Sequence, residues 1–258
     1  MSKVTLDQLL DAGVHFGHLK SKWDPNMAPY IFMEKNGIHV IDLYKTMKKM
    51  DEACGAIKNI AKSGRKILFV ATKKQAKDIV IEAADSVNMP YVTERWLGGM
   101  LTNFATVRKS IKKMQTIDKM EQDGTFKNMA KRERLILTRE RDKLNRVLGG
   151  ISDLTRIPAG LFIIDIKKEH IAVSESHKLN LTSFGMVDTN SNPRVVDYAI
   201  PANDDSTKSI ELITSTLRDS IAEGLDERRR AKEEAKAKQE AKKKEKEAKA
   251  EAEGAEEK

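Results

Sequence analysis

The sequence predicts an α/β protein: a parallel-sheet, Rossmann-like (flavodoxin-like) domain with an inserted antiparallel α-helical coiled-coil hairpin. Short apolar runs alternate with amphipathic stretches of helical length, which is typical of βαβ units and a parallel sheet. A central segment interrupts this alternation, because its apolar residues recur every three or four positions with no strand between them. The chain ends in a segment whose only apolar residue is alanine.

The first 43 residues predict a short helix, a loop, an irregular segment and one strand. Thr5 and Gln8 have the spacing of a capping box, and the helix that they begin ends near Gly13. The histidine-containing residues 15–18 follow in a loop. Residues 20–37 mix aromatic side chains and prolines with polar groups, which indicates irregular backbone, and residues 38–43 are typical of a short buried strand.

The alternation of strands and helices occupies two stretches of the chain. Apolar runs too continuous for half-exposed strands are separated by helical patterns, as buried parallel strands require. The expected elements are a helix near 45–62, a strand at 66–70, a helix near 73–87, a strand at 91–93, a strand at 161–165, a helix near 169–179, a strand at 183–187 and a helix at 206–223.

Between the two stretches, residues 104–148 predict two helices that pack antiparallel. Phe104, Val107 and Ile111 begin an apolar stripe with helical spacing, and a similar stripe returns after Asp123 and Gly124. The expected organisation is therefore an α/β domain at 1–103 and 149–225, the hairpin at 104–148, and a tail at 226–258. Because the tail consists of Lys, Glu and Ala with few other residues, we expect it to be disordered or a frayed helix.

The net charge of +8 is unevenly distributed. Residues 101–150 carry 13 basic and 6 acidic side chains, whereas residues 151–225 carry 7 basic and 11 acidic ones. A localised basic surface favours an anionic partner such as RNA. The alternative is a solvated charged face, although such a face usually balances its charges more evenly. The acidic window is a candidate protein-facing side.

Composition also restricts the compartment. Cys54 is the single cysteine, so no internal disulfide framework can form, which suits a reducing compartment. No stretch approaches the roughly 18 to 20 apolar residues of a membrane span, and the N-terminus lacks a signal-peptide pattern. We therefore expect a cytoplasmic protein with no membrane partner.

An enzyme that binds a nucleotide at Thr72–Gln75 is the main alternative to a binding protein. The sequence lacks the glycine-rich loops of nucleotide sites, and no GxxxxGK[ST] motif occurs. Lys73 and Lys74 begin a predicted helix, where free N–H groups can hold a phosphate of either a nucleotide or RNA. We expect no enzyme activity, no small-molecule substrate and no required cofactor.

Two further groups have alternatives that the sequence leaves open. Arg95 and Trp96 combine a planar cation with an aromatic face, as RNA binders do, but a buried Trp that anchors the hairpin fits equally well. The neighbouring Gly98 and Gly99 permit a tight turn or close packing where the sheet joins the hairpin. The second group is a candidate site with nitrogen and oxygen ligands for a structural Zn or Mg ion. The alternative is that Asp204 and Asp205 cap the helix that follows them. The candidate ligands of this site are His15, His18, Asp188, Asp204 and Asp205.

Taken together, these segments resemble the bacterial family of small-subunit ribosomal protein two, over residues 5 to about 220. The most specific stretch is Arg95–Phe104, and Ala71 departs from the glycine usual in the family. The other matching segments are His15–His18, Trp23–Tyr30, Ile38–Leu43, Leu68–Ala76, Leu161–Asp165, Val187–Pro193 and Ile200–Asp205.

The resemblance implies a structural constituent of the small ribosomal subunit that binds 16S rRNA near the junction of head and body. It also implies neighbouring ribosomal proteins as partners and docking of small-subunit ribosomal protein one. We expect recognition of RNA shape and backbone by basic groups, whereas a third interpretation has the hairpin bind an acidic protein. The predicted RNA-binding residues are Lys20, Lys22, Lys73, Lys74, Arg95, Trp96, Arg108, Lys109, Lys112, Lys113, Lys131 and Arg132.

Overall fold

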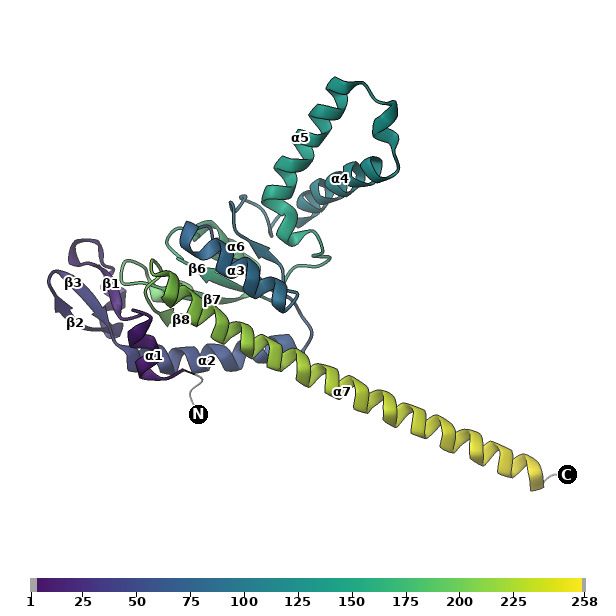
Figure 1. Ribbon diagram of the computed structural model, residues 1–258. Coiled ribbons are helices and arrows are strands. Elements are labelled where there is room, and N and C mark those ends of the chain that lie inside the picture. Colours follow the sequence, from purple (N-terminus) through teal and green to yellow (C-terminus); the bar gives the residue numbers. More distant parts are fainter. Residues whose placement is uncertain (1–3, 257–258) are drawn as a thin grey trace.

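Five short apolar runs form a parallel sheet in the computed structural model, which describes residues 4–256, apart from the side chains of 127, 128 and 235–256 (Figure 1). The strand order is β5-β4-β6-β7-β8 and every pairing is parallel. Numbered along the chain within this sheet, the order is 2-1-3-4-5, the flavodoxin-like doubly wound order. The strands are β4 (Ile67–Val70), β5 (Tyr91–Val92), β6 (Gly160–Ile164), β7 (Thr182–Val187) and β8 (Tyr198–Pro201).

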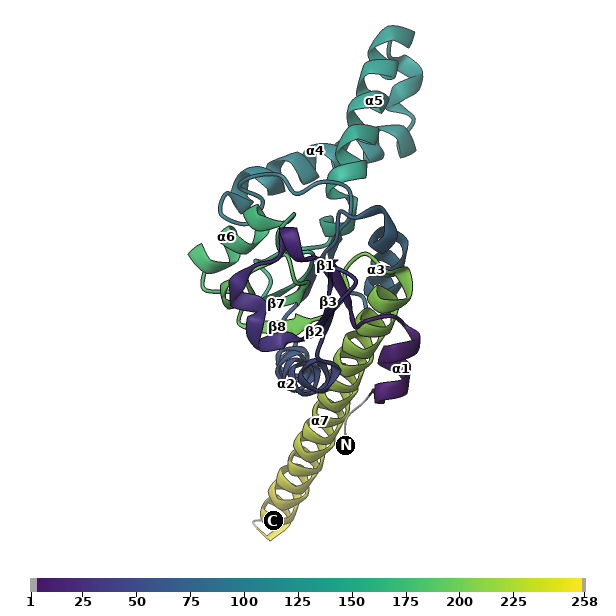
Figure 2. The same ribbon diagram turned by 90° about the vertical axis from the view of Figure 1, so that its left-hand side faces the viewer.

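Helices cover both faces of this sheet, which confirms the predicted α/β architecture. Successive side chains of a strand point to opposite faces, so Phe69 packs with α2, α3 and α7 while Leu68 packs with α6 and residues 96–101. Figure 2 shows α6 on one side of the strands and α3 and α7 on the other. The bounds are α2 (Leu43–Lys62), α3 (Lys74–Ser86), α6 (His170–Lys178) and α7 (Thr207–Glu256).

The N-terminal segment contains more regular structure than the sequence predicted. After α1 (Leu6–Asp11), an antiparallel sheet forms in the order β1-β3-β2. The sequence predicted a loop at residues 15–18 and irregular backbone over 20–37. Both predictions were wrong for the residues that form β1 and β2. Both strands are largely exposed, so they lack the buried alternation that marks a strand. The bounds are β1 (Phe16–Leu19), η1 (Lys20–Lys22), η2 (Pro25–Tyr30), β2 (Ile31–Lys35) and β3 (Ile38–Ile41).

Two other strand predictions need correction. The predicted strand at 38–43 ends at Ile41, because Asp42 Oδ1 accepts a hydrogen bond from Tyr44 N at 3.1 Å and so begins α2. The structure also adds β8, which the sequence did not predict. Its last residue, Pro201, cannot donate to a ladder, and β8 lies at the edge of the sheet, where proline is tolerated.

Residues 104–148 form the two expected helices, α4 (Phe104–Gln122) and α5 (Lys131–Leu148). Gly124 has φ +74° in the turn between them, a conformation that glycine adopts without strain. Ile111, Met114 and Ile117 are buried along α4, and the two helices project together from the sheet (Figure 1). The short helices η3 (Thr125–Asn128), η4 (Gly149–Ile151) and η5 (Pro193–Val195) complete the described elements.

The last helix is longer than the sequence predicted. A helix expected at 206–223 continues as α7 to Glu256 and leaves the domain (Figure 1). The boundary expected at residue 226 therefore lies inside this helix. A disordered or frayed tail over 226–258 stays a prediction, and residues 257–258 lie outside the described part of the chain.

Candidate functional site

Charged side chains from four strands meet at the carboxyl edge of the parallel sheet. Lys73 follows β4, Asp165 follows β6, Asp188 follows β7 and Asp204 follows β8. The carboxyl ends of parallel strands lie at one edge, which is where α/β proteins of this order bind ligands. Residues that are far apart in the sequence are thus gathered into one group, which we call the edge cluster: Lys73, Asp165, Asp188, Asp204, Asp205 and His18.

Lys73 is the central cation of the edge cluster. Its Nζ lies 3.0 Å from Asp165 Oδ2, 2.7 Å from Asp204 Oδ1 and 2.8 Å from Asp205 Oδ1. Burial alone would lower the pKa of Lys73, but attraction to Asp204 and the contacts with Asp205 and Asp165 outweigh it and raise the pKa. With 13% of its side chain exposed, Lys73 is already neutralised within the protein.

The ion pair of Lys73 and Asp165 bears on the nucleotide alternative. The order of the sheet reverses between β4 and β6, and ligands of doubly wound folds lie in the crevice at that point. Asp165 has φ +63°, a strained conformation for a non-glycine residue, and its Oδ1 accepts a hydrogen bond from Lys168 N at 3.0 Å. Lys73 and Asp165 therefore pair with each other at this point, and a hollow of about 300 Å³ at the same edge is lined by residues that include Thr72, Trp96 and Glu169.

His18 enters the edge cluster from β1. A Cβ on Gly17 would lie 2.5 Å from a methyl carbon of Thr189, so only glycine lets β1 approach this closely. His18 N donates to Thr189 Oγ1 at 2.8 Å, and His18 Nδ1 lies 3.0 Å from Asp188 Oδ2. The carboxylate of Asp188 raises the pKa of His18, against the opposing effect of burial.

Asp204 is the most deeply buried carboxylate of the edge cluster. It is fully buried, and its Oδ2 has no hydrogen-bond partner among the described residues. Burial, followed by repulsion from Asp188 and Asp165, raises the pKa of Asp204 to about 7, although Lys73 opposes this rise. Asn203 Oδ1, and not an aspartate, accepts the amide hydrogen bonds of Asp205 and Ser206 before α7, at 2.9 and 3.3 Å.

The predicted metal ligands are only partly brought together. His18, Asp188 and Asp204 each offer an atom within 4.8 Å of the others. Asp205 is adjacent, with its Oδ2 3.4 Å from His18 Nε2, whereas His15 is not part of this group. The ring of His15 instead lies 4.0 Å from that of Phe16, centroid to centroid and tilted by 38°, and burial lowers the pKa of His15.

A second buried carboxylate, Glu175 of α6, organises the segment before α4. Its oxygens accept hydrogen bonds from Gly99 N at 2.8 Å, from Leu101 N and Thr102 N at 2.9 Å each, and from Trp96 Nε1 at 3.1 Å. Burial alone would raise the pKa of Glu175, but these hydrogen bonds outweigh burial and lower the pKa. No sequence signal pointed to Glu175, because its partners lie more than 70 positions away.

The predicted RNA-binding residues have three kinds of surroundings. Trp96 is 6% exposed and hydrogen-bonded to Glu175, which favours its role as an anchor, and Lys73 is held by aspartates. Arg108 donates to Leu154 O at 2.7 Å, Lys113 pairs with Glu140, and Lys20 lies 2.8 Å from Glu34. Exposed, with no ion pair to a described carboxylate, are Lys22, Lys74, Arg95, Lys109, Lys112, Lys131 and Arg132.

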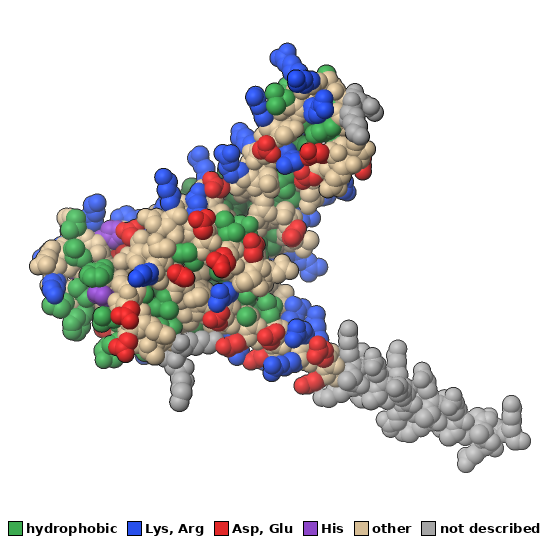
Figure 3. Space-filling view, viewed as in Figure 1, with side chains coloured by type: hydrophobic (Ala, Val, Ile, Leu, Met, Phe, Trp, Pro, Cys, Tyr) green, Lys and Arg blue, Asp and Glu red, His purple; other side chains and the backbone are tan. Residues whose placement is uncertain are grey.

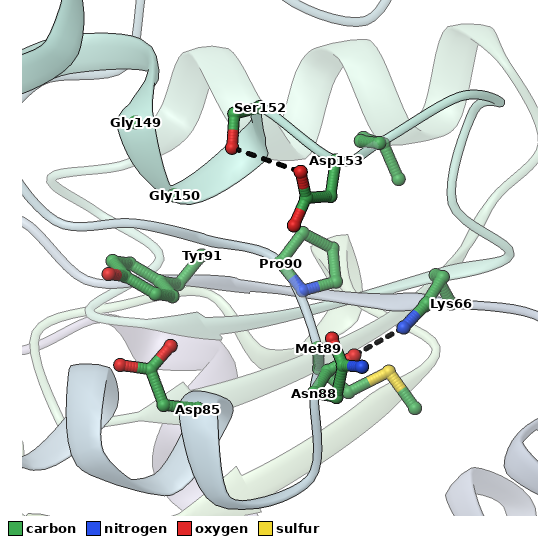
Figure 4. Close-up of a pocket in the computed structure, with 11 residues that line it drawn as sticks. Lys66, Asp85, Asn88, Met89, Pro90, Tyr91, Gly149, Gly150, Ser152 and Asp153 are labelled. Atoms are coloured by element: carbon green, nitrogen blue, oxygen red, sulfur yellow. Dashed lines mark hydrogen bonds between the residues drawn. The ribbon is translucent and has the colours of Figure 1, made fainter.

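Of the eleven carboxylates in the acidic window at 151–225, five are buried, so the acidic surface there is smaller than the charge count suggests. A protein-facing side on this window stays a prediction. Beneath the two projecting helices, a hollow of about 150 Å³ lies between Lys66, Tyr91 and Asp153 (Figure 4). A Cβ on Gly150 would lie 2.3 Å from Tyr91 O, so the chain leaving α5 packs directly on β5. This hollow is too small for a nucleotide. The buried carboxylates are Asp165, Glu169, Glu175, Asp188 and Asp204.

These features define a class. The chain is an α/β protein that holds internal ion pairs at the carboxyl edge of its sheet and carries exposed cations on two projecting helices. Across residues 4–256, no helix is both long and apolar enough to span a membrane.

The model of the ribosomal protein S2 family matches residues 9–224, and the chain belongs to this family. A small ribosomal subunit protein uS2 of Parabacteroides distasonis is 64% identical, over 91% of this chain and 84% of its own length. The uS2 proteins of Flavobacterium johnsoniae and Bacteroides thetaiotaomicron are each 62% identical over 90% of this chain, and over 91% and 84% of their own lengths. This match confirms the resemblance. The family is structural and not enzymatic, which excludes the enzyme alternative.

Proposed function

We propose that this chain is a structural constituent of the small ribosomal subunit, acting in translation in the cytoplasm. It binds 16S rRNA through basic surfaces, contacts neighbouring small-subunit proteins and helps to dock ribosomal protein one. Its uS2 relatives carry the name of a small-subunit protein, which supports this role.

The exposed cations of α4 and α5 carry the RNA part of the proposal. Lys and Arg side chains gather along these helices (Figure 3), and four of the predicted residues there have no ion pair to a described carboxylate. The phosphates of RNA fit such unpaired cations, because neutralising them releases the counterions condensed on the RNA backbone. Packing of α4 and α5 as a coiled-coil insertion extends these cations away from the domain. The four residues are Lys109, Lys112, Lys131 and Arg132.

An apolar surface at the opposite end supports the docking of a protein. Phe16, Phe32, Met33 and Tyr44 are exposed around a hollow of about 400 Å³, and Phe32 and Tyr44 are 72% and 74% exposed. Hydrophobic side chains gather over β1, β2 and β3 in Figure 3. Contiguous exposed apolar surface marks protein interaction sites. We assign this surface to ribosomal protein one.

A charge-reversal pair tests the RNA assignment. Lys109, Lys112 and Arg132 are replaced together by Glu, and the control replaces Lys48, Lys178 and Lys208, which are exposed outside α4 and α5. We expect the first variant to leave small-subunit fractions in sucrose gradients at moderate salt, while the control stays. The slope of log K against log salt for 16S rRNA should become shallower by about 2, from roughly 0.7 per lost phosphate contact. Equal behaviour of the two variants would remove these helices from the RNA surface.

A second pair tests the docking surface. Phe32→Glu should retain this chain in the small subunit but release protein one, since a charge opposes burial of the apolar surface. Ile171→Glu, on the exposed side of α6, is the matched control and should retain both. Retention of protein one by Phe32→Glu at the level of the control would exclude this surface.

A further inference from the structure

We propose that the hollow lined by Thr72, Trp96 and Glu169 binds one unstacked guanine nucleotide of RNA. In this site Glu169 accepts hydrogen bonds from the base, and Arg95 holds a phosphate. The inference rests on the proposed RNA binding and deepens it, because it adds a base-specific contact to recognition of the RNA backbone.

The position of the hollow is the first support. The chain runs from β4 to β5 on one side and then to β6 on the other, so a crevice lies between β4 and β6, where doubly wound folds bind ligands. Thr72 follows β4 and Glu169 precedes α6, and both line the hollow of about 300 Å³. Ligand pockets range from roughly 300 to 1,000 Å³, so this one suits a single base and not a stack of bases.

The second support is the state of the Glu169 carboxylate. Glu169 is 4% exposed, and among the described residues its hydrogen bonds come from Thr72 alone. Burial raises the pKa of Glu169, and the contacts with Thr72 and Lys168 do not outweigh this effect. Glu175, by contrast, accepts hydrogen bonds from four residues, and its pKa is lowered. Glu169 therefore favours a ligand that brings further N–H donors.

The chemistry of a carboxylate selects guanine among the four bases. An ionised carboxylate only accepts hydrogen bonds, so it fits a base edge with two adjacent donors. Guanine presents N1–H and its N2 amino group side by side on the Watson–Crick edge, which proteins contact in unstacked RNA. Adenine, cytosine and uracil each place an acceptor beside their donor. Trp96 supplies a flat apolar wall, and its Nε1 donates to Glu175 Oε1 at 3.1 Å, which holds the indole in place.

Cations at the rim supply the contact for the phosphate. Arg95 lines the hollow, is exposed and has no ion pair to a described carboxylate, so its guanidinium is available to two phosphate oxygens. Lys168 also lines the hollow, and its Nζ donates to Thr72 O at 3.2 Å. Glu94 is paired with Lys77 at 2.8 Å, so it does not repel the phosphate strongly. A buried acceptor with a cation outside it matches the base and phosphate of one nucleotide.

The test titrates the full-length chain with RNA hexamers of uridine that carry G, A, C or U at one central position. The chain has two tryptophans, so in a Trp23→Phe background the fluorescence of Trp96 reports occupation of the hollow. The G hexamer should bind about 5- to 100-fold tighter than the other three, which is the discrimination of one bidentate base contact. Inosine, which lacks the N2 amino group, should lose most of this preference, whereas 7-deazaguanosine should keep it.

Two variants separate base recognition from phosphate binding. Glu169→Gln should abolish the preference for G and bind the all-uridine hexamer as the parent does, while Asp153→Asn, at the opposite end of the sheet, keeps the preference. Arg95→Gln should weaken all four hexamers by a similar factor, and Lys178→Gln, at an exposed cation outside the hollow, should weaken none. Circular dichroism identifies loss of the fold. The inosine comparison needs no variant, so it decides the question if Glu169→Gln does not fold.

Equal binding of the four hexamers by the parent, or an unchanged preference in Glu169→Gln, would overturn the proposal. Binding of guanosine monophosphate as tightly as the G hexamer would overturn the assignment to RNA and identify a free nucleotide as the ligand. Failure of the site is distinguishable from failure of the proposed function, because 16S rRNA would still bind through α4 and α5. Charge reversal on those helices should, in turn, leave the preference for G unchanged.

Discussion

Cations in two regions of this molecule share a chemistry and differ in what surrounds them. At the edge cluster, Lys73 is held by three aspartates and is largely buried. On α4 and α5, Lys109 and Lys112 are exposed and have no ion pair to a described carboxylate. Buried charges must find partners within the protein, whereas exposed ones are available to phosphates. The count of charges along a sequence therefore does not reveal which of them a partner can reach.

The largest effect is expected at Glu175, a buried carboxylate whose oxygens are satisfied by hydrogen bonds. Glu175→Ala should lower the free energy of unfolding by about 3–5 kcal/mol, because several buried donors lose their acceptor. Urea unfolding of the isolated chain measures this. Glu94→Gln, at an exposed carboxylate paired with Lys77, should leave the free energy of unfolding nearly unchanged, because solvent screens exposed ion pairs. A similar small loss for both variants would show that enclosure does not matter here.

The same carboxylate predicts a pH dependence. The folded pKa of Glu175 is below its ordinary value of 4.5, so its stabilising contribution is present above pH 4.5 and is lost as the pH falls through the folded pKa. The stability difference between the parent chain and Glu175→Gln should therefore narrow from pH 6 toward pH 3. Urea midpoints measured at each pH test this, and a difference that stays constant would contradict the lowered pKa.

A smaller effect is expected where β1 meets the edge cluster. Gly17→Ala should lower the free energy of unfolding by about 1–3 kcal/mol, because the added methyl group overpacks against Thr189. Gly55→Ala is the matched control, since Gly55 lies in α2 with open space around it and should stabilise the chain by about 0.5–1 kcal/mol. Thermal unfolding of both variants should move in opposite directions. Movement in the same direction would mean that β1 is not packed closely on the cluster.

The smallest effect separates paired from unpaired cations on the projecting helices. Arg141 lies 2.6 Å from Glu121 and 3.5 Å from Asp118, so Arg141→Gln should cost about 0.5 kcal/mol, while Lys109→Gln should cost close to zero. Binding to 16S rRNA should rank in the reverse order, with Lys109→Gln the weaker binder. Both the free energy of unfolding and the affinity for 16S rRNA are measured for each variant. Loss of rRNA affinity in Arg141→Gln alone would contradict the distinction between paired and unpaired cations.

Most of the fold could be predicted from local sequence patterns. The apolar runs that became β4, β6 and β7 and the three-and-four spacing of α4 were readable because each depends on residues close in sequence. The largely exposed β1 and β2, and β8 with its final proline, were missed for the opposite reason. Their pairing is decided by strands elsewhere in the chain and not by their own side chains.

The candidate sites divide in the same way. By itself the sequence determined the α/β class, the two helices of residues 104–148, the basic excess on them and the family motifs, because composition and periodicity are local properties. Only the tertiary structure decided that Lys73 and Trp96 are enclosed, that Glu175 holds the segment before α4, and that His18 reaches Asp188, 170 positions away. Burial and partnership depend on contacts between distant segments, and these exist only once the strands and helices have packed.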